Sequence, residues 1–435
     1  MFGYYFGLGL RSLRRNPALT ALMVMAIGFG VAASMTTYSI FRATSNNPIP
    51  EKSAQLYAVQ IANWKPDDLD KGEPPTALNY TDAMALMRAH KAPRQTALYP
   101  VGPSVIPADA SRLPLRQTTY AVYGDAFPMF DIPFLYGSGW SAREDQARAA
   151  VMVISRSLND KLFNGANSVG REVNLDGHSY RVTGVMDVWD PQPLFFDATN
   201  TGGFGDPVDM FIPFTRAVDE EMPTAGNNNC NATPATGWDG WIRSECIWLA
   251  YWVELPTAAQ ATAYRQFLHG YAAEQQRAGR FTWAPNVRLR NVTDWLDFQQ
   301  VVPPESKISL LVSLGFLLIC LVNTVGLLLA KFMRRAPEIG VRRALGASRA
   351  NIYAQFLIEA AAVGVAGGLV GLLLTGLGVL GVGLVFDPQI ARLARLDVSL
   401  VGLTLLVSIL ATVLAAFYPT WRAAQVQPAW QLKSN

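Results

Sequence analysis

The densest group of charged side chains in the sequence lies in one short segment, from Lys331 to Asn351. It carries six basic residues against a single acid, Glu338. Pro337 suits the first turn of a helix, Gly346 suits its end, and Ser348 can cap a following helix. The residues alone therefore predict a short basic helix, whose simplest role is to anchor the chain beside membrane headgroups.

Residue types used in catalysis or metal binding are few and scattered. The histidines, His90, His178 and His269, lack the spacing of metal ligands, and there is no Gly-x-Ser-x-Gly motif or Cys/His zinc arrangement. No Gly-x-x-x-x-Gly-Lys-Ser/Thr loop is present to hold nucleotide phosphates. The sequence predicts that this chain is not an enzyme and has no catalytic residue, metal site or cofactor of its own.

Two of the three cysteines could form a disulfide. Cys230 and Cys246 flank a segment rich in Asn, Gly and Thr, whereas Cys320 lies in an apolar stretch. A bridge that closes a loop of about 15 residues stabilises by about 3 kcal/mol in an oxidising compartment. The alternative is two unrelated thiols.

The composition of the chain is typical of a protein that lies partly in a membrane, because half of its residues are hydrophobic and only 16% are charged. A membrane-spanning helix needs about 20 consecutive apolar residues. Four stretches meet this requirement, residues 17–41, 308–330, 353–386 and 398–421, the third being free of charge after Glu359. The first is longer than the apolar core of a signal peptide, so we expect it to remain as a membrane helix.

The distribution of basic residues predicts the orientation of the spans. Short loops rich in Lys and Arg stay in the cytoplasm, which places both termini and the 331–352 loop inside. Residues 42–307 then lie outside, with 23 basic and 29 acidic residues. Their net negative charge argues against nucleic-acid binding, because the overall charge of +3 comes from basic residues of the cytoplasmic face.

The predicted fold class is a membrane α-helical protein with four transmembrane helices and a large α+β extracytoplasmic domain between the first and second. In that domain, residues 171–185 alternate around Asp176-Gly177, which predicts a hairpin. We also expect a strand at 150–154, helices at 157–163 and 258–278, and long loops at 187–240. The predicted segments are an amphipathic surface helix or a simple extension of the first span (1–16), span 1 (17–41), the outer domain (42–307), span 2 (308–330), a cytoplasmic loop (331–352), span 3 (353–386), an outer loop (387–397), span 4 (398–421) and a cytoplasmic tail (422–435).

Polar residues and glycines inside the spans are further candidates. Glu359 is costly to bury alone, so it should have a partner or face water, with a packing or a proton role both open. Asn323 is a second polar residue within a span. The glycine pairs 364/368 and 367/371 have the small-xxx-small spacing of tight helix contacts, within the chain or across a subunit interface.

These motifs resemble those of the MacB/FtsX family of ABC permeases. Residues 338–347 match the family's "REIGxRxAxGA" block, and residues 356–360 match its "FLxEA" block. Residues 418–428 are similar to its closing "P(A)xxAAxxxP" segment, although Trp430 stands where a smaller residue is usual. Residues 155–185 resemble the MacB-type periplasmic core, whereas 187–252 match the family least.

The resemblance implies that the 338–346 region is a coupling helix that docks on a cytoplasmic ABC ATPase. It assigns Glu338, Arg342 and Arg343 to that contact, with Gly340 and Gly346 permitting close approach and a turn. It further implies the inner membrane of a bacterium with the large domain in the periplasm. The implied partners are two copies of an ATPase subunit that binds ATP and Mg, a second permease, identical or related, membrane lipids, and in some family members a periplasmic adaptor and outer-membrane channel.

The implied function is export or efflux of a substrate from the periplasm or the outer leaflet. Two alternatives stay open: a mechanical transmitter that activates a cell-wall hydrolase or sensor without transport, and a permease that extracts lipoproteins.

Overall fold

The structure is a computed structural model that describes residues 16–107, 111, 113–302, 304–385 and 396–425. The chain divides into two compact units, one formed by residues 1–45 and 302–435 and the other by Asn46–Val301. We refer to them as the membrane unit and the large domain. The predicted surface helix at residues 1–15, the segment around Pro428 and Trp430, and most of the 387–397 loop lie outside the described residues.

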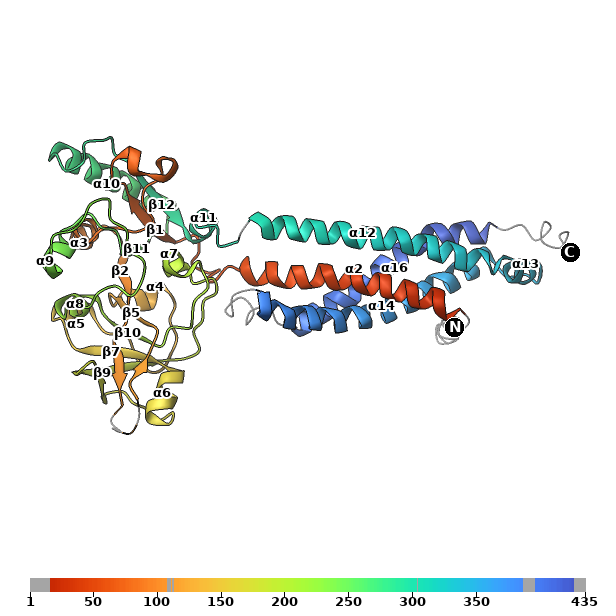
Figure 1. The fold of residues 1–435 in the computed structure, drawn as a ribbon, viewed down its shortest axis with the longest axis horizontal. Coiled ribbons are helices and arrows are strands. Elements are labelled where there is room, and N and C mark those ends of the chain that lie inside the picture. Colours follow the sequence, from red (N-terminus) through yellow and green to blue (C-terminus); the bar gives the residue numbers. More distant parts are fainter. Residues whose placement is uncertain (1–15, 108–110, 112, 303, 386–395, 426–435) are drawn as a thin grey trace. The chain divides into compact units, whose positions relative to one another are not determined.

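Among the described residues of the membrane unit, four helices are long and apolar enough to cross a membrane. They are α2 (Pro17–Thr44), α12 (Pro304–Met333), α14 (Arg349–Val385) and α16 (Val398–Ala424), with the short α13 (Ala336–Ala344) between α12 and α14. At several ends they extend past the predicted apolar stretches by about one turn. Helix α14 packs against both α2 and α16, and α12 packs mainly against α2 (Figure 1).

Twelve strands in the described part of the large domain form one sheet in the order β12-β1-β11-β2-β5-β10-β7-β9-β8-β3-β4, with β6 paired to β9. The strands are β1 (Leu56–Ile61), β2 (Arg94–Val101), β3 (Ser104–Ile106), β4 (Leu115–Arg116), β5 (Thr119–Val122), β6 (Phe134–Gly137), β7 (Val151–Ser155), β8 (Glu172–Leu175), β9 (His178–Met186), β10 (Met210–Pro213), β11 (Ala250–Glu254) and β12 (Val287–Asn291). The sheet is mixed, because most neighbours are antiparallel while β10 is parallel to β5 and β7 is parallel to β9.

Both faces of the sheet carry a hydrophobic core. Along β7, Met152 and Ile154 belong to one core and Val151 and Val153 to the other, as expected when successive side chains point to opposite faces. The helices that complete the domain are α3 (Tyr80–Ala89), α4 (Ala126–Met129), α5 (Ala142–Gln146), α6 (Arg156–Phe163), α7 (Ala198–Thr201), α8 (Phe214–Asp219), α9 (Gly237–Ile242), α10 (Ala258–Arg277) and α11 (Val292–Phe298), with 3-10 turns η1 (Pro66–Asp68), η2 (Asp70–Gly72) and η3 (Phe195–Asp197). The predicted fold class, four membrane helices with an α+β domain between the first and second, is confirmed.

The predicted hairpin is present as β8 and β9, which pair antiparallel with Leu175 opposite His178. Asp176 and Gly177 form its two-residue turn with φ values of 46° and 97°. Positive φ at both positions is what this turn requires, and Asp-Gly tolerates it. Helices α6 and α10 also lie where the apolar spacing predicts them.

The expectation of long loops over residues 187–240 is wrong in part. This stretch contains η3, α7, α8 and the strand β10, which lies inside the sheet between β5 and β7. All four residues of β10 are buried and its run ends at Pro213, so it shows no alternation of polar and apolar residues. A short strand that is covered on both faces lacks the pattern by which strands are predicted.

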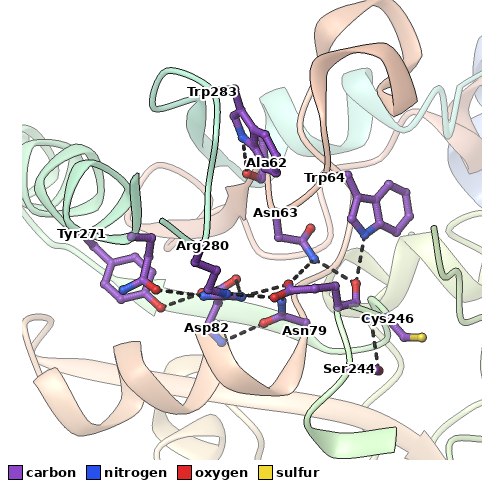
Figure 2. A network of polar contacts seen from close by, with 12 residues as sticks. Ala62, Asn63, Trp64, Asn79, Asp82, Ser244, Cys246, Tyr271, Arg280 and Trp283 are labelled. Atoms are coloured by element: carbon purple, nitrogen blue, oxygen red, sulfur yellow. Dashed lines mark hydrogen bonds and ion pairs between the residues drawn. The ribbon is translucent and has the colours of Figure 1, made fainter. Parts of the chain in front are cut away.

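A partly buried ion network joins three separate segments of the large domain, as Figure 2 shows. Arg280, just after α10, donates from Nη2 to Asp82 of α3 at 2.9 Å and from Nε to Glu245 at 2.8 Å. Tyr271 donates its hydroxyl to Asp82 at 2.6 Å, and Trp64 donates Nε1 to the carbonyl of Glu245 at 2.9 Å. Burial alone lowers the pKa of Arg280, but its hydrogen bonds to Glu245 and Asp82 raise that pKa above its usual value.

The network holds the end of a disulfide-closed loop in place. Cys246 follows Glu245 directly and is bonded to Cys230 in the structure. The loop is therefore fixed both by a covalent bond and by charge-assisted hydrogen bonds from Glu245 to the core of the domain.

We predict that Arg280→Met destabilises the large domain, because it leaves the Asp82 carboxylate, only 1% exposed, without its cation. The expected loss is about 3 kcal/mol, at the lower end for a buried pair because Arg280 is itself 20% exposed. Thermal unfolding followed by tryptophan fluorescence measures this domain, because nine of the 11 tryptophans lie between residues 46 and 301. Arg277→Met, at an exposed position of α10, is the matched control. Equal unfolding temperatures for both variants would contradict a stabilising role for the network.

Candidate functional site

The short helix α13 is defined by residues that begin and end helices. Pro337 occupies its first turn, and Gly346, just beyond its last residue, has a φ of 98° that favours glycine. Ser348 then accepts a hydrogen bond from the backbone N–H of Asn351 at 3.2 Å, which caps the start of α14. The predicted helix and its boundaries are therefore present between α12 and α14.

A buried ion pair lies where α12 meets α14. Lys331 Nζ is 2.7 Å from Glu359 Oε1, and these side chains are 1% and 2% exposed. Arg335, in the turn after α12, donates Nη1 to Glu359 Oε2 at 2.8 Å and has a 14% exposed side chain. Of the two options for Glu359, a partner or contact with water, the structure shows partners.

The ion pair continues into α13 as a chain of alternating charges. Arg335 also contacts Glu338 at 3.3 Å, and Glu338 in turn contacts Arg342 at 2.5 Å. Arg342 donates Nη1 to Gln355 of α14 at 2.9 Å. We call Lys331, Glu359, Arg335, Glu338 and Arg342 the ion chain. It links α12, α13 and α14.

A third membrane helix is connected through Arg343, which donates Nη1 to the carbonyl of Ala424 in the last turn of α16 at 3.3 Å. The C-terminal carbonyls of a helix lack intrahelical partners, so a guanidinium there is favourable. The charged residues that the family resemblance assigned to a partner thus make contacts inside the membrane unit.

The two faces of α13 differ in chemistry. Ala336, Ile339 and Gly340 are buried against the membrane unit. The other face presents Val341 and Leu345, whose exposed fractions are 54% and 83%. Pro337 extends the exposed face, and Arg334 and Arg349 lie exposed beyond its two ends. Gly340 therefore lies on the inner face, and Gly346 at the exposed end.

The exposed apolar face was missed by reasoning from the charges. The signal was available, because Pro337, Val341 and Leu345 recur every four residues and so share one side of a helix. The prediction assigned the partner contact to the arginines instead, because charged groups commonly form hydrogen bonds to a partner.

The glycines of α14 form two separate contacts within the chain. A Cβ on Gly364 would lie 2.2 Å from Thr412 Oγ1 of α16, and one on Gly368 would lie 3.0 Å from Leu405. On the adjoining side, a Cβ on Gly367 would lie 2.9 Å from Ile27 of α2, and one on Gly371 would lie 3.3 Å from Val31. One glycine pair therefore faces α16 and the other faces α2, which explains the spacing of both.

Two comparisons with protein families bear on this geometry. The MacB-like periplasmic core domain family matches residues 20–266, more than half of the chain, and the FtsX-like permease C-terminal family matches residues 310–428. The chain belongs to the MacB/FtsX-like permease family. ATP-driven transport or mechanical transmission is typical of this family, and α13 lies in its FtsX-like part.

Individual relatives of the permease are distant. The "Macrolide export ATP-binding/permease protein MacB" of Escherichia coli O157:H7 is 22% identical over 374 residues, which are 84% of this chain and 51% of the relative. The protein of the same name from Azoarcus sp. is 25% identical over 386 residues, 88% of this chain and 52% of the relative. The chain thus spans about half the length of these curated relatives. The periplasmic region of MacB from Actinobacillus actinomycetemcomitans is 12% identical with a TM-score of 0.37, covering 59% of this chain and 96% of that chain.

We predict that Glu359→Met destabilises the membrane unit of the permease by about 3 kcal/mol, because Lys331 is left buried without a counter-charge. The double variant Lys331→Met/Glu359→Met should recover much of the loss, since two apolar side chains then pack together. Cys320 provides the readout: it is buried, and the other two cysteines are joined as a disulfide. A thiol-reactive dye therefore reports unfolding of the membrane unit as Cys320 becomes accessible. The single variant Lys331→Met completes the comparison. If the double variant lost as much free energy of unfolding as the two single variants together, the coupling would be contradicted.

Proposed function

We propose that this chain is the permease subunit of an ABC transporter, which couples ATP hydrolysis by a separate ATPase to movement of its large domain and so exports a substrate. The observation that carries the proposal is the two-sided character of α13. One side is bound to α12, α14 and α16 by the ion chain and Arg343, and the other is exposed and apolar. A helix with one bound and one free side can receive a force from a partner and pass it to the membrane helices.

A separate ATPase fits the sequence and the family. The 435 residues contain no Gly-x-x-x-x-Gly-Lys-Ser/Thr loop, and the matched regions are a periplasmic core domain and a permease domain. Two ATPase subunits, each binding ATP and Mg, would serve a pair of permeases in the inner membrane of a bacterium, with α13 in the cytoplasm and the large domain in the periplasm.

The docking surface that we propose is the exposed face of α13, composed of Pro337, Val341 and Leu345 with Arg334 and Arg349 at its edges. An apolar centre with charged groups around it is typical of protein interfaces. This differs from a contact through Arg342 and Arg343, because those arginines already pair with Glu338, Gln355 and Ala424. Their role in this proposal is to transmit movement rather than to bind the ATPase.

We predict that Val341→Asp and Leu345→Asp release the ATPase, because a carboxylate placed in an apolar contact must be desolvated. The expected loss of affinity is about 30-fold or more, the size of a strong interface residue. Affinity-tagged permease purified from its native membranes, with the co-purifying ABC ATPase identified by mass spectrometry, gives the measurement. Val188→Asp, the same change at a 77% exposed valine of the large domain, is the control. Retention of the ATPase by both α13 variants would reject the docking surface.

A second variant separates docking from transmission. Arg342→Met removes the end of the ion chain but keeps the exposed face of α13, so we expect the ATPase to stay bound. Common coupling free energies between two sites correspond to factors of about five or more. We therefore expect the ATP-dependent change in tryptophan fluorescence of the large domain to fall about fivefold or more. An unchanged fluorescence response would show that movement does not pass through the ion chain.

Export can be distinguished from the alternatives by what changes in cells that lack the chain. Accumulation of a compound in the periplasm supports export. Altered cell-wall hydrolysis without any accumulation would support mechanical signalling, and lipoproteins retained in the inner membrane would support extraction.

A further inference from the structure

The disulfide-closed loop between Cys230 and Cys246 is held on the large domain mainly by contacts between rings. In the described structure, the hydrogen bonds of residues 231–243 stay within the loop, and none of these residues takes part in an ion pair. The loop contains the short helix α9, whose Trp238 and Trp241 are partly buried against one core of the domain. Between its two fixed ends, the loop is therefore attached to the domain by apolar contacts.

Both tryptophans of α9 lie against one buried indole, that of Trp248. The ring centroids of Trp238 and Trp241 are 6.3 Å and 6.0 Å from that of Trp248. Trp248 is only 2% exposed, and it also lies at right angles to Tyr99 at 4.8 Å and parallel to Tyr80 at 6.4 Å. The rings of α9 therefore occupy positions on an aromatic surface where other flat rings can stack.

Trp248 also carries a hydrogen-bond donor that its surroundings do not satisfy. Its Nε1 is buried and has no acceptor among the described residues. The other four buried tryptophans of the large domain all donate from Nε1 at 2.8 to 3.2 Å, namely Trp64, Trp140, Trp252 and Trp295. A buried donor without an acceptor costs free energy, so a molecule that brings an acceptor to Trp248 gains a hydrogen bond.

Helix α9 has space to move away from Trp248. A cavity of about 510 Å³ is lined by residues of the loop alone, at positions 231–236, 239, 240 and 243–245. Trp238 and Trp241 are three residues apart and share one side of α9, whereas positions 239, 240 and 243 lie on the other side. The rings and the cavity are thus on opposite sides of α9. The disulfide keeps the two ends of the loop together when α9 moves into the cavity.

We propose that residues 230–246 are the lid of a binding site for flat aromatic compounds. The ligand takes the positions of Trp238 and Trp241 on Trp248 and supplies an oxygen as the acceptor for Nε1. Apolar rings with a few polar groups are the usual lining of a small-molecule site. The inference goes beyond the proposed function, and it is tested on the permease alone, so failure of α13 docking remains a separate result.

Umbelliferone tests the site, because it is a flat, fluorescent, fused-ring compound with a carbonyl oxygen. Fluorescence anisotropy measures its binding to the purified full chain in lipid nanodiscs. Trp238→Ala/Trp241→Ala should lower the dissociation constant about fivefold or more, because the ligand no longer competes with the two ring contacts. Trp283→Ala, at a partly buried tryptophan that stacks on Phe281 instead, is the control and should leave the constant unchanged. Unchanged or weaker binding by the double variant would overturn the proposal.

A substitution of Trp248 tests the donor. Trp248→Phe keeps an aromatic ring but removes the N–H group. Added to the double variant, it should raise the dissociation constant of umbelliferone about fivefold, the size of one hydrogen bond. Naphthalene, a flat ring compound without an oxygen, should bind equally with and without the substitution. An equal loss for both compounds, or for neither, would overturn the role of Nε1.

Cleavage by trypsin reports the movement of the lid. Arg243 is the only Lys or Arg in residues 231–246. Chains cut after Arg243 stay joined by the disulfide, so this cut yields two fragments only after reduction. Cleavage follows the population of the open form, so umbelliferone should raise the rate of this cut and leave the rates at other sites unchanged. A rate at Arg243 that umbelliferone leaves unchanged or lowers would overturn the movement of the lid.

Discussion

The arrangement of the membrane unit depends on keeping the Glu359 carboxylate compensated in a site that excludes water. A carboxylate that is 2% exposed requires cations and hydrogen-bond donors at short range, and Lys331 and Arg335 provide them. These three residues come from the end of α12, the turn that follows it and the first third of α14. These contacts therefore fix the position of the turn, and of the start of α13, relative to α12 and α14. Apolar residues in place of these three could pack as well, but they would not fix the direction of α13 relative to the end of α12.

The glycines of α14 link this end of the helix to α2 and α16 further along its length. Because one pair lies against α2 and the other against α16, α14 approaches both neighbours closely along its length. Ser408 of α16 adds a hydrogen bond to the carbonyl of Gly364 at 2.7 Å. Close backbone packing leaves little room for one helix to move without its neighbours, so a displacement of α13 at one end would move α14 together with α2 and α16. In the proposed function, the ion chain and the glycine contacts are successive parts of one transmission path.

The parts of the structure that were predictable are those with a regular sequence pattern. Apolar length identified four membrane helices, and Asp176-Gly177 between alternating residues identified the β8–β9 hairpin. Strand β10 was missed, because its four buried residues, the last of which is Pro213, show no alternation of polar and apolar side chains. The cost of burying Glu359 predicted that it has a partner or faces water, but not which of the two, nor that Lys331 and Arg335 are its partners. Spacing along one chain does not specify which residues of other helices lie opposite, so the ion chain and the direction of each glycine pair required the three-dimensional structure.

The chemistry of α13 shows why residue type alone is a weak guide to a docking surface. Arginines next to a membrane can bind a partner, a headgroup or their own protein, and the sequence does not distinguish these. Here Arg342 and Arg343 contact their own bundle, whereas Val341 and Leu345 are left exposed. These contacts lie within the chain, so the arginines can hold α13 in place without a partner. An apolar face that is already held in place loses little conformational entropy on binding. The same division applies to α12, where Cys320 packs inside the bundle while Asn323 faces outward. In the proposed function, the exposed apolar face of α13, rather than its arginines, is the surface that binds the partner.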